Sequence, residues 1–386
     1  MKIDKIKEIF RHLYAGEADI YLAPGRINLI GEHTDYNDGF VLPAAIDKHV
    51  IFGIKDNGLT TYRFHAIDLE DSFEADMENL EPTSKGWPNY LLGVIDQMNK
   101  LGHIIPGFDC VVTSDIPIGA GLSSSAALEA GLATGLNELF DLGISNLDLV
   151  KLSQRAENEF VGVNCGIMDQ FASVFGRSNH VFRLDCRSLD YDYFPLNLDE
   201  NGIILVDTKV KHSLGSSEYN TRRKECETGV SQVARKHPGV KSLRDVTMDM
   251  LDEVKDDLDP VVFRRCAYVI REIDRVVKAC DDLQAGRLVE FGRKMYETHA
   301  GLSADYEVSC EELDFLVDAT KDNPNILGSR MMGGGFGGCT INILHKKAIP
   351  EFKNKISEAF QQKFNHPPVF YEVLIDDGVR RYVDKR

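Results

Sequence analysis

A glycine- and serine-rich segment in the first half of the chain has the composition of an anion-binding loop. It reads Pro117-Ile118-Gly119-Ala120-Gly121-Leu122-Ser123-Ser124-Ser125 and lies between a predicted strand, Phe108–Ser114, and a predicted helix, Ser124–Phe140. Backbone N–H groups at a helix N-terminus have no partner within the helix and lie at the positive end of its dipole. Three consecutive serines exceed what one helix cap needs, so we predict a phosphate-binding loop, although the Walker A pattern is absent.

A second glycine run, Gly333–Gly338, follows Met332 and formally matches the pattern G-x-G-x-x-G. A dinucleotide-binding fingerprint must open a helix, whereas the residues that follow, Cys339–Leu344, are β-branched and typical of a strand. The context therefore argues against an enzyme that uses nicotinamide or flavin. Either a tight hairpin bend or the close approach of a ligand would explain the glycines, and the sequence leaves both explanations open.

A third segment near the N-terminus concentrates polar side chains between apolar ones. Glu32, His33, Asp35 and Tyr36 form a dense cluster, with Arg26 a few residues earlier. Carboxylates and a histidine can bind a metal ion, accept hydrogen bonds from the hydroxyls of a sugar, or simply lie in a solvated loop. No second cluster has the spacing of metal ligands, so the sequence favours a sugar site.

The chain has 386 residues and is acidic, since 44 Lys and Arg against 61 Asp and Glu give a formal charge of −17. Binding to nucleic acid or to an anionic membrane depends on clustered positive charge, so we expect neither as a partner. No run approaches the ~18 apolar residues of a membrane span. A small anionic ligand stays compatible with this charge, because local geometry decides its binding.

The first residues predict an amphipathic helix, because Ile3, Ile6, Phe10 and Leu13 recur at helical spacing. Charges interrupt this segment, and it lacks the apolar core and cleavage site of a secretory signal, so we expect a cytoplasmic protein. The eight cysteines are scattered singly without a C-x-x-C pair. We therefore expect free thiols, mostly buried.

Helices and strands are interleaved along the chain without a strict βαβ order, which predicts an α+β fold. Further strands are expected at Asp19–Ala23, Ala45–Ile54, His180–Leu184, Ile203–Val206, Thr340–Leu344 and Val369–Ile375. Further helices are expected at Asn89–Lys100, Asn146–Phe160, Ser217–Lys236, Pro260–Cys280, Leu283–Ala300, Ser309–Lys321 and Ile349–Phe364. The acidic, turn-rich stretch Asn197–Gly202 suggests a boundary between two lobes, residues 1–195 and 196–386.

The three segments, in this order and at these separations, resemble the GHMP kinase superfamily, and Gly25–Tyr36 is similar to the galactokinase signature. Further similar segments are Ala156–Phe160, Cys165–Gln170, Lys211–Ser213, Ser217–Asn220 and Ser309–Asp314. The resemblance implies a two-lobed fold with the active site in the cleft between the lobes. It also implies ATP-dependent phosphorylation of the anomeric 1-hydroxyl of galactose, the first step of galactose catabolism. Met332 replaces a threonine common in the family, and no role is transferred to it.

The same resemblance assigns roles to individual residues. It implies that Asp169 is the general base beside Arg26, and that Mg²⁺ is held by Ser125 and Glu157. The sugar contacts that it implies are Glu32, His33, Thr34, Asp35, Gly166 and Tyr219. The ATP contacts that it implies are Gly119, Ala120, Gly121, Leu122, Ser123, Ser124, Ser125 and Trp87, whose ring is expected near the adenine together with Tyr90.

The glycine run Gly333–Gly338 is expected against the cleft without a catalytic role. The expected partners are ATP and galactose, and the expected state is a monomer. Two rivals stay open: a kinase for a related acceptor such as N-acetylgalactosamine or galacturonate, and a catalytically silent sugar sensor. The sensor is disfavoured because the loop residues Ser123–Ala126 and the base Asp169 are all present.

Overall fold

A computed structural model describes residues 2–117, 119–163, 165–211 and 215–384, so Ile118, His212 and Ser213 of the motifs lie outside the described residues. The first lobe contains a six-stranded sheet in which only β4 and β6 run parallel. Its strands, in spatial order, are β13 (Arg380–Arg381), β1 (Asp19–Asn28), β3 (Pro43–Asp56), β6 (Phe108–Ser114), β4 (Thr61–Ala66) and β5 (Asp71–Asp76).

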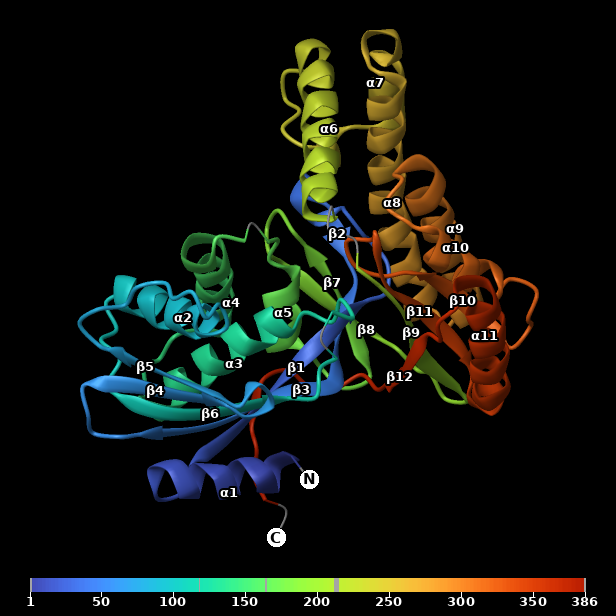
Figure 1. The fold of residues 1–386 in the computed structure, drawn as a ribbon. Coiled ribbons are helices and arrows are strands. Elements are labelled where there is room, and N and C mark those ends of the chain that lie inside the picture. The colour runs from blue at the N-terminus through green and yellow to red at the C-terminus, as the bar shows by residue number, and fades with distance from the viewer. Residues whose placement is uncertain (1, 118, 164, 212–214, 385–386) are drawn as a thin grey trace.

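Both faces of this sheet are covered by helices. Four helices cover one face: α2 (Pro88–Lys100), α3 (Ser124–Leu139), α4 (Asn146–Arg155) and α5 (Met168–Phe175). Helix α1 (Lys2–Tyr14) lies on the opposite face, as Figure 1 shows. Successive strand residues point to opposite faces, so Ile20, Ile51 and Val111 pack with α1. Their neighbours Tyr21, Phe52 and Val112 join the main core.

A second, antiparallel sheet lies beside the first. Its strands, in spatial order, are β10 (Ile326–Met331), β11 (Gly337–His345), β9 (Asn201–Lys211) and β12 (Val369–Val373). One face contributes Ile203 and Ile341 to the main core, and the other packs against α10 (Glu311–Asp318) and α11 (Ile349–Phe364). A small third sheet consists of β2 (Phe40–Val41), β7 (His180–Asp185) and β8 (Tyr191–Pro195).

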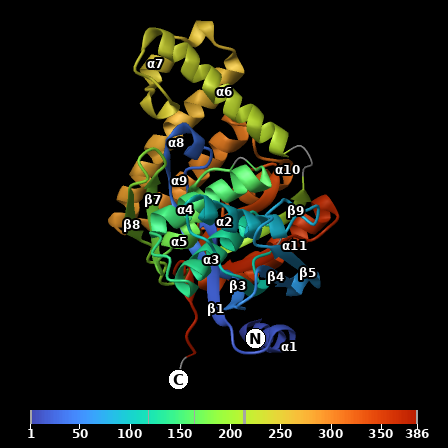
Figure 2. The same ribbon diagram turned by 90° about the vertical axis from the view of Figure 1, so that its left-hand side faces the viewer.

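The remaining helices extend the second lobe away from the sheets. Helices α6 (Gly215–Lys236), α7 (Met248–Asp252) and the upper part of α8 (Pro260–Gln284) project from the body of the molecule, as Figures 1 and 2 show. Helix α9 (Leu288–Ala300) runs back along β10. A separate hydrophobic cluster that includes Val233, Leu251 and Cys266 holds the projection together.

The structure confirms the predicted α+β, two-lobed architecture, with two local differences. The helix expected over Asn146–Phe160 changes at Ala156 into the π-helical turn η3 (Ala156–Val161). The helix expected over Leu283–Ala300 is two elements, because α8 ends at Gln284 and Gly286, with φ +69°, forms the turn before α9. Leu13, expected on the buried face of the first helix, is 42% exposed.

The C-terminal residues contact both lobes. Strand β12 pairs with β9 of the second sheet, Ile375 forms an isolated bridge with Ile46, and β13 pairs with β1 of the first sheet. The proposed division at residue 195 falls in the short connection between β8 and β9. On that division, the last residues of the second lobe return to complete the first.

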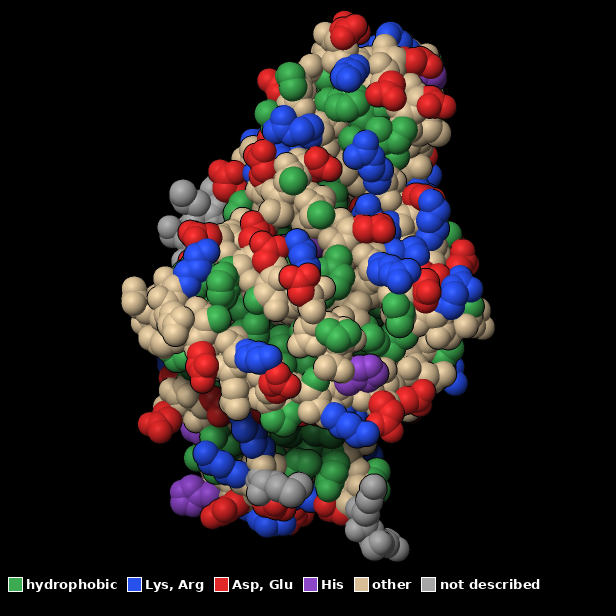
Figure 3. All heavy atoms as spheres, turned by 90° about the vertical axis from the view of Figure 1, so that its right-hand side faces the viewer, with side chains coloured by type: hydrophobic (Ala, Val, Ile, Leu, Met, Phe, Trp, Pro, Cys, Tyr) green, Lys and Arg blue, Asp and Glu red, His purple; other side chains and the backbone are tan. Residues whose placement is uncertain are grey.

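The cysteines are free, as expected from their scattered positions in the sequence. All eight cysteines are free, and Cys110, Cys226, Cys266, Cys280 and Cys339 are buried. Within the described ranges, no helix has the length and apolar character needed to cross a membrane. On the face shown in Figure 3, acidic and basic side chains are interspersed rather than gathered by sign.

The contact of α3 with the sheet depends on Gly131, because a Cβ atom there would overlap the ring of Phe52 and the methyl group of Ala23. We expect Gly131→Leu to lower the free energy of unfolding by about 2 kcal/mol or more, since overpacking displaces core side chains. Thermal denaturation measures this. Gly239→Leu is the matched control, because a Cβ there meets nothing within 4 Å; equal midpoints for the two variants would contradict the prediction.

Candidate active site

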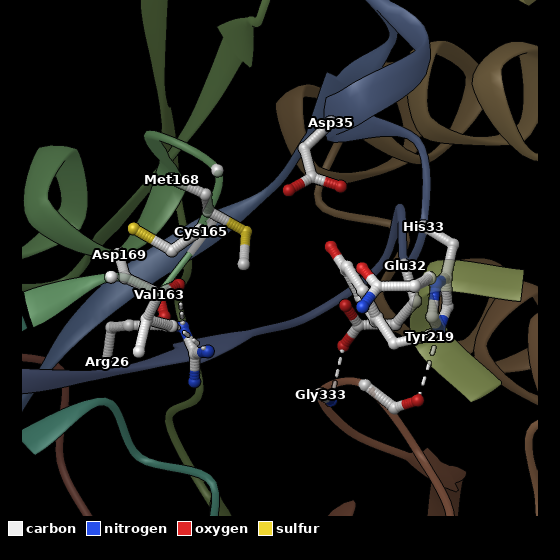
Figure 4. A pocket seen from close by; sticks show the side chains of 14 residues that line it. Arg26, Glu32, His33, Asp35, Val163, Cys165, Met168, Asp169, Tyr219 and Gly333 are labelled. Carbon is white, nitrogen blue, oxygen red and sulfur yellow. Dashed lines mark hydrogen bonds and ion pairs between the residues drawn. The ribbon is translucent and has the colours of Figure 1, made fainter. Parts of the chain in front are cut away.

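A cavity of about 520 Å³ lies between the two lobes. Seven of the residues predicted for the site line it: Arg26, Glu32, His33, Asp35, Gly166, Asp169 and Tyr219. Figure 4 shows Arg26 and Asp169 on one side of this space, His33 and Tyr219 on the other, and Asp35 between them. The fold therefore brings residues from β1, α5, α6 and the loops between them to one place.

A bidentate ion pair forms one wall of the cavity. Arg26 donates from Nε to Oδ1 of Asp169 at 2.7 Å and from Nη2 to Oδ2 at 3.0 Å. The Ser123 hydroxyl also donates to Oδ2. Arg26 is only 6% exposed, so its charge requires this partner. Asp169 is thereby held as a hydrogen-bond acceptor at the cavity surface.

The predicted phosphate-binding loop lies next to this pair. Gly119, Gly121 and Ser123 have positive φ angles, and α3 begins at Ser124 without a side-chain cap, because the Ser123 hydroxyl turns to Asp169. The helix N-terminus therefore keeps N–H groups free of a side-chain cap for an anion. Arg26 also fixes the loop by two further hydrogen bonds. Its Nη1 donates to the carbonyl oxygen of Gly121 at 2.6 Å, and its backbone N donates to the carbonyl oxygen of Leu122 at 3.2 Å.

Ala120 and Leu122 were expected to contact the nucleotide, but their side chains point into the protein. Both side chains are almost fully buried and pack into the main core. They anchor the loop, and only their backbone atoms remain available to a ligand.

The two predicted metal ligands are neighbours. Ser125, on α3, lies near Glu157, which is in η3 and is buried. Burial raises the pKa of Glu157, and the negative charge of Asp169 adds to the shift. Gln170 donates from Nε2 to Oε2 of Glu157 at 2.8 Å.

The charge balance here suits a cation. Burial, and then the charge of Glu157, raise the pKa of Glu129 to about 10, and Asp169 adds to the shift. Across the described segments, no group of three or more His, Cys, Asp and Glu side chains has metal-binding geometry. A hydroxyl and one carboxylate nevertheless fit Mg²⁺, which takes few protein ligands when nucleotide phosphates supply the others.

Glu32 joins the two lobes. Its carboxylate accepts hydrogen bonds from Nδ2 of Asn28 at 2.9 Å and from the backbone N of Gly333 at 2.8 Å, and it forms an ion pair with the fully buried Arg330. Most of its hydrogen-bonding capacity is thus used within the protein. The geometry gives Glu32 a positioning role at the cavity wall.

His33 makes a second connection between the lobes. Burial lowers the pKa of His33 to about 4, so the ring is neutral. Its Nε2 lies 3.2 Å from the carbonyl oxygen of Gly334, which can only accept, so this nitrogen carries the hydrogen. Nδ1 then accepts from the hydroxyl of Tyr36 at 2.9 Å.

Thr34 was expected to contact the sugar, but its side chain does not line the cavity. It is fully buried, and its hydroxyl lies 2.9 Å from the carbonyl oxygen of Gly31 and 2.6 Å from that of Phe40. A side chain that is directed inward shapes the loop rather than binding a ligand.

Asp35 is the acidic side chain that the protein leaves most available to the cavity. Burial raises the pKa of Asp35 from 3.8 to about 6, and backbone N–H groups oppose this shift. A Cβ atom at position 166 would overlap Oδ2 of Asp35, so only glycine allows the carboxylate to lie there. The two predicted sugar contacts, Asp35 and Gly166, therefore depend on each other.

Comparison with known proteins gives consistent results along the chain. Residues 8–55 match the galactokinase galactose-binding signature, residues 89–177 the GHMP kinases N terminal domain, and residues 271–362 the GHMP kinases C terminal region. Galactokinase from Thermotoga maritima is 43% identical over 359 residues, which cover 93% of this chain and 99% of that protein. The chain belongs to the galactokinase family. Galactokinase from Clostridium acetobutylicum is 40% identical and covers 98% of this chain and 97% of its own length.

Solved structures place the fold in the same family. The Lactococcus lactis galactokinase complexed with galactose matches with a TM-score of 0.94 at 32% identity, over 99% of this chain and 100% of that one. A mevalonate kinase matches with a TM-score of 0.65 at 19% identity, covering 93% and 99%. This second match shows the GHMP kinase fold alone.

Two residues that the family pattern left without a role lie in the cavity wall. The backbone N–H of Gly333 donates to Glu32, as Figure 4 shows, and the carbonyl oxygen of Gly334 accepts from His33. Gly335 and Gly337 instead have positive φ angles and lie against the backbone of Val308 and Val210. The run lies at the bend between the paired strands β10 and β11, as the first explanation requires, and the close approach of a ligand to Gly333 and Gly334 stays a prediction.

Cys165, Met168 and Asn220 also line the cavity of this galactokinase family member. They were not predicted, because nothing in the sequence around them indicates a function for their side chains. Trp87 does not line it. The Trp87 indole N–H donates to Oδ2 of Asp71 at 3.0 Å, and its ring packs beside the main core. Its proposed contact with adenine would thus use only the remaining ring surface.

The raised pKa of Asp35 predicts a cost in stability. Above pH 6 the folded protein holds a buried charge that the unfolded chain hydrates, so the cost appears as the pH rises from 3.8 to about 6. We expect Asp35→Asn to raise Tm by about 1–3 °C at pH 7.5 and by less at pH 4. Calorimetry at the two pH values measures this, with the exposed Asp252→Asn as control. A lower Tm for Asp35→Asn at pH 7.5 would show that the carboxylate stabilises the fold.

Proposed function

We propose that this protein transfers the γ-phosphoryl group of ATP to the anomeric 1-hydroxyl of galactose, producing galactose 1-phosphate and ADP. The observation that carries the proposal is the Arg26–Asp169 pair in a cavity next to an uncapped helix N-terminus. Membership of the galactokinase family, and the likeness to a galactokinase complexed with galactose, support the identity of both substrates. This reaction is the first step of galactose catabolism.

Asp169 has the geometry of a general base. Its carboxylate lies at the cavity surface, where the acceptor hydroxyl can donate to it as the phosphoryl group moves. Arg26 orients the carboxylate and places positive charge beside the reacting oxygens, where negative charge develops. Phosphoryl transfer needs mainly such positioning and electrostatic stabilisation.

The loop from Gly119 to Ser125 is the proposed phosphate site. Its positive φ angles and the start of α3 direct backbone N–H groups toward an anion. Ser125 and Glu157 would hold Mg²⁺, which neutralises charge on the phosphate oxygens when it is bound. This local arrangement explains how a chain with a formal charge of −17 binds a polyanion.

The sugar site is proposed on the opposite side of the cavity. Asp35 accepts hydrogen bonds from ring hydroxyls, since a carboxylate offers two oxygens in a fixed orientation. Tyr219 lines the same space, and its ring lies 5.5 Å from that of His33. Glu32 and His33 contribute by holding Gly333 and Gly334 against the sugar.

Every proposed site residue comes from one chain, so a monomer suffices for the reaction. Consumption of ATP is compatible with the cytoplasmic location expected from the sequence. A second cavity, of about 600 Å³, shares Asp35, Gly166 and Tyr219 with the first and also contains Lys151 and Arg223. These cations make galacturonate the related acceptor most worth comparing.

A coupled assay for ADP tests the function directly. With ATP and Mg²⁺, galactose is expected to give the highest kcat/KM among galactose, glucose, mannose, N-acetylgalactosamine and galacturonate. Each product would be identified by nuclear magnetic resonance as the 1-phosphate. Absence of turnover on every hexose would reject the proposal, whereas a preference for galacturonate would change only the acceptor.

Replacing the base tests the mechanism. Asp169→Asn is expected to lower kcat by about 10²–10⁴-fold, because the amide cannot take the proton of the hydroxyl. ADP binding, measured by calorimetry, should stay within a few-fold of the original, since the loop is retained. The control variant is Asp252→Asn. Substantial activity in Asp169→Asn would mean that Arg26 and positioning carry the catalysis.

A further inference from the structure

A second carboxyl group lies behind the proposed metal ligand and takes no part in the mechanism described so far. Glu129 is on α3, one turn after Ser125, and has no exposed surface. Glutamate is almost never fully buried unless a specific partner holds it. Its neighbours here are another carboxyl group, Glu157, and the amide of Gln170.

Gln170 connects the two carboxyl groups. Its Nε2 lies 3.2 Å from Oε2 of Glu129 and 2.8 Å from Oε2 of Glu157, so one amide group donates to both. Glu157 is therefore held from the protein side by the buried amide of Gln170, which Glu129 also accepts from, while Ser125 approaches it from the loop.

The positions of these residues follow from the helices that carry them. Ser125 and Glu129 are four residues apart on α3, so they lie on the same face of the helix. Gln170 directly follows the proposed base, and adjacent residues of a helix point about 100° apart. Helix α5 thus directs Asp169 to the cavity and Gln170 to the buried carboxyl groups.

Neither Glu129 nor Gln170 lines the cavity, and both are fully buried, so any effect on the ligands passes through Glu157 or through Cys165, which contacts both Gln170 and Glu157. A carboxylate on a flexible side chain binds a cation well only when its orientation is fixed. Glu157 lies in a π-helical turn, a geometry found often at functional sites. The hydrogen bond from Gln170 supplies this fixed orientation, and Glu129 holds the same amide from its other side.

We propose that Glu129 and Gln170 are positioning residues that hold the Glu157 carboxylate toward the nucleotide-bound divalent cation. The inference rests on the proposed cation-binding role of Glu157. It adds two residues that touch neither substrate and that the family motifs leave without a role. Loss of such supporting hydrogen bonds typically weakens metal binding by about 10–100-fold.

A pair of variants of equal size tests the proposal. Glu129→Met removes the hydrogen-bonding group and keeps the volume, whereas Glu129→Gln keeps a hydrogen-bonding end group. Mn²⁺ binding in the presence of a non-hydrolysable ATP analogue, followed by electron paramagnetic resonance, gives a readout without turnover. We expect Glu129→Met to weaken Mn²⁺ binding by about 10-fold or more and Glu129→Gln to bind within about 3-fold of the original.

Galactose affinity, measured by calorimetry without nucleotide, separates positioning from general damage and should be unchanged in both variants. Glu157→Ala serves as the reference. If it weakens Mn²⁺ binding and Glu129→Met does not, the inference is wrong and the proposed function stands. If Glu157→Ala binds Mn²⁺ normally, the cation-binding role itself is wrong. If Glu129→Met does not fold, Gln170→Met, which removes the bridging N–H donors at similar volume, is compared with the original protein. Equal Mn²⁺ affinity of the two proteins then overturns the inference.

Discussion

The guanidinium group of Arg26 is the constraint on which the rest of the site depends. It is buried on β1 and donates to both oxygens of Asp169 and to the carbonyl oxygen of Gly121. One planar group thus sets the distance between strand β1, the start of α5 and the phosphate-binding loop. The fork of N–H donors on arginine makes this possible, whereas a lysine has a single point charge. Because this charge is buried and needs its hydrogen-bond partners, β1, α5 and the loop are all held in place by the same side chain.

The second lobe is attached to this arrangement by backbone groups. Glu32 and Arg330 form a buried ion pair, and Glu32 and His33 also bind the N–H of Gly333 and the carbonyl of Gly334. A buried ion pair adds little net stability, but leaving one partner alone is costly, which favours a single arrangement of the lobes. The glycine run meets this requirement because its backbone approaches the first lobe without side chains between them.

The sequence predicted the parts of the site that involve local patterns. The strand, loop and helix around Gly119–Ser125 follow from glycines, serines and apolar spacing, and the structure has these elements at the expected residues. Contacts between distant segments were beyond reach. The backbone N–H of Gly333 binds a residue 301 positions away, and the bond from Trp87 to Asp71 spans 16 residues. The bonds of Thr34 are local, but no sequence pattern marks its hydroxyl as turned inward. Glu129 reads as an ordinary helix acid, since its burial depends on how α3 packs against α5.

The chain closes on itself at the first sheet. Strand β13 pairs with β1, and Lys7 forms an ion pair with Asp384 at 2.7 Å, so the two ends of the molecule lie side by side (Figure 1). During synthesis, the strand that carries Arg26 is made long before β13, so its outer edge gains a partner only after Arg380 and Arg381 have left the ribosome. The first lobe therefore cannot complete its sheet as an independent folding unit. Until then, the open edge of β1 is exposed to pairing with other chains.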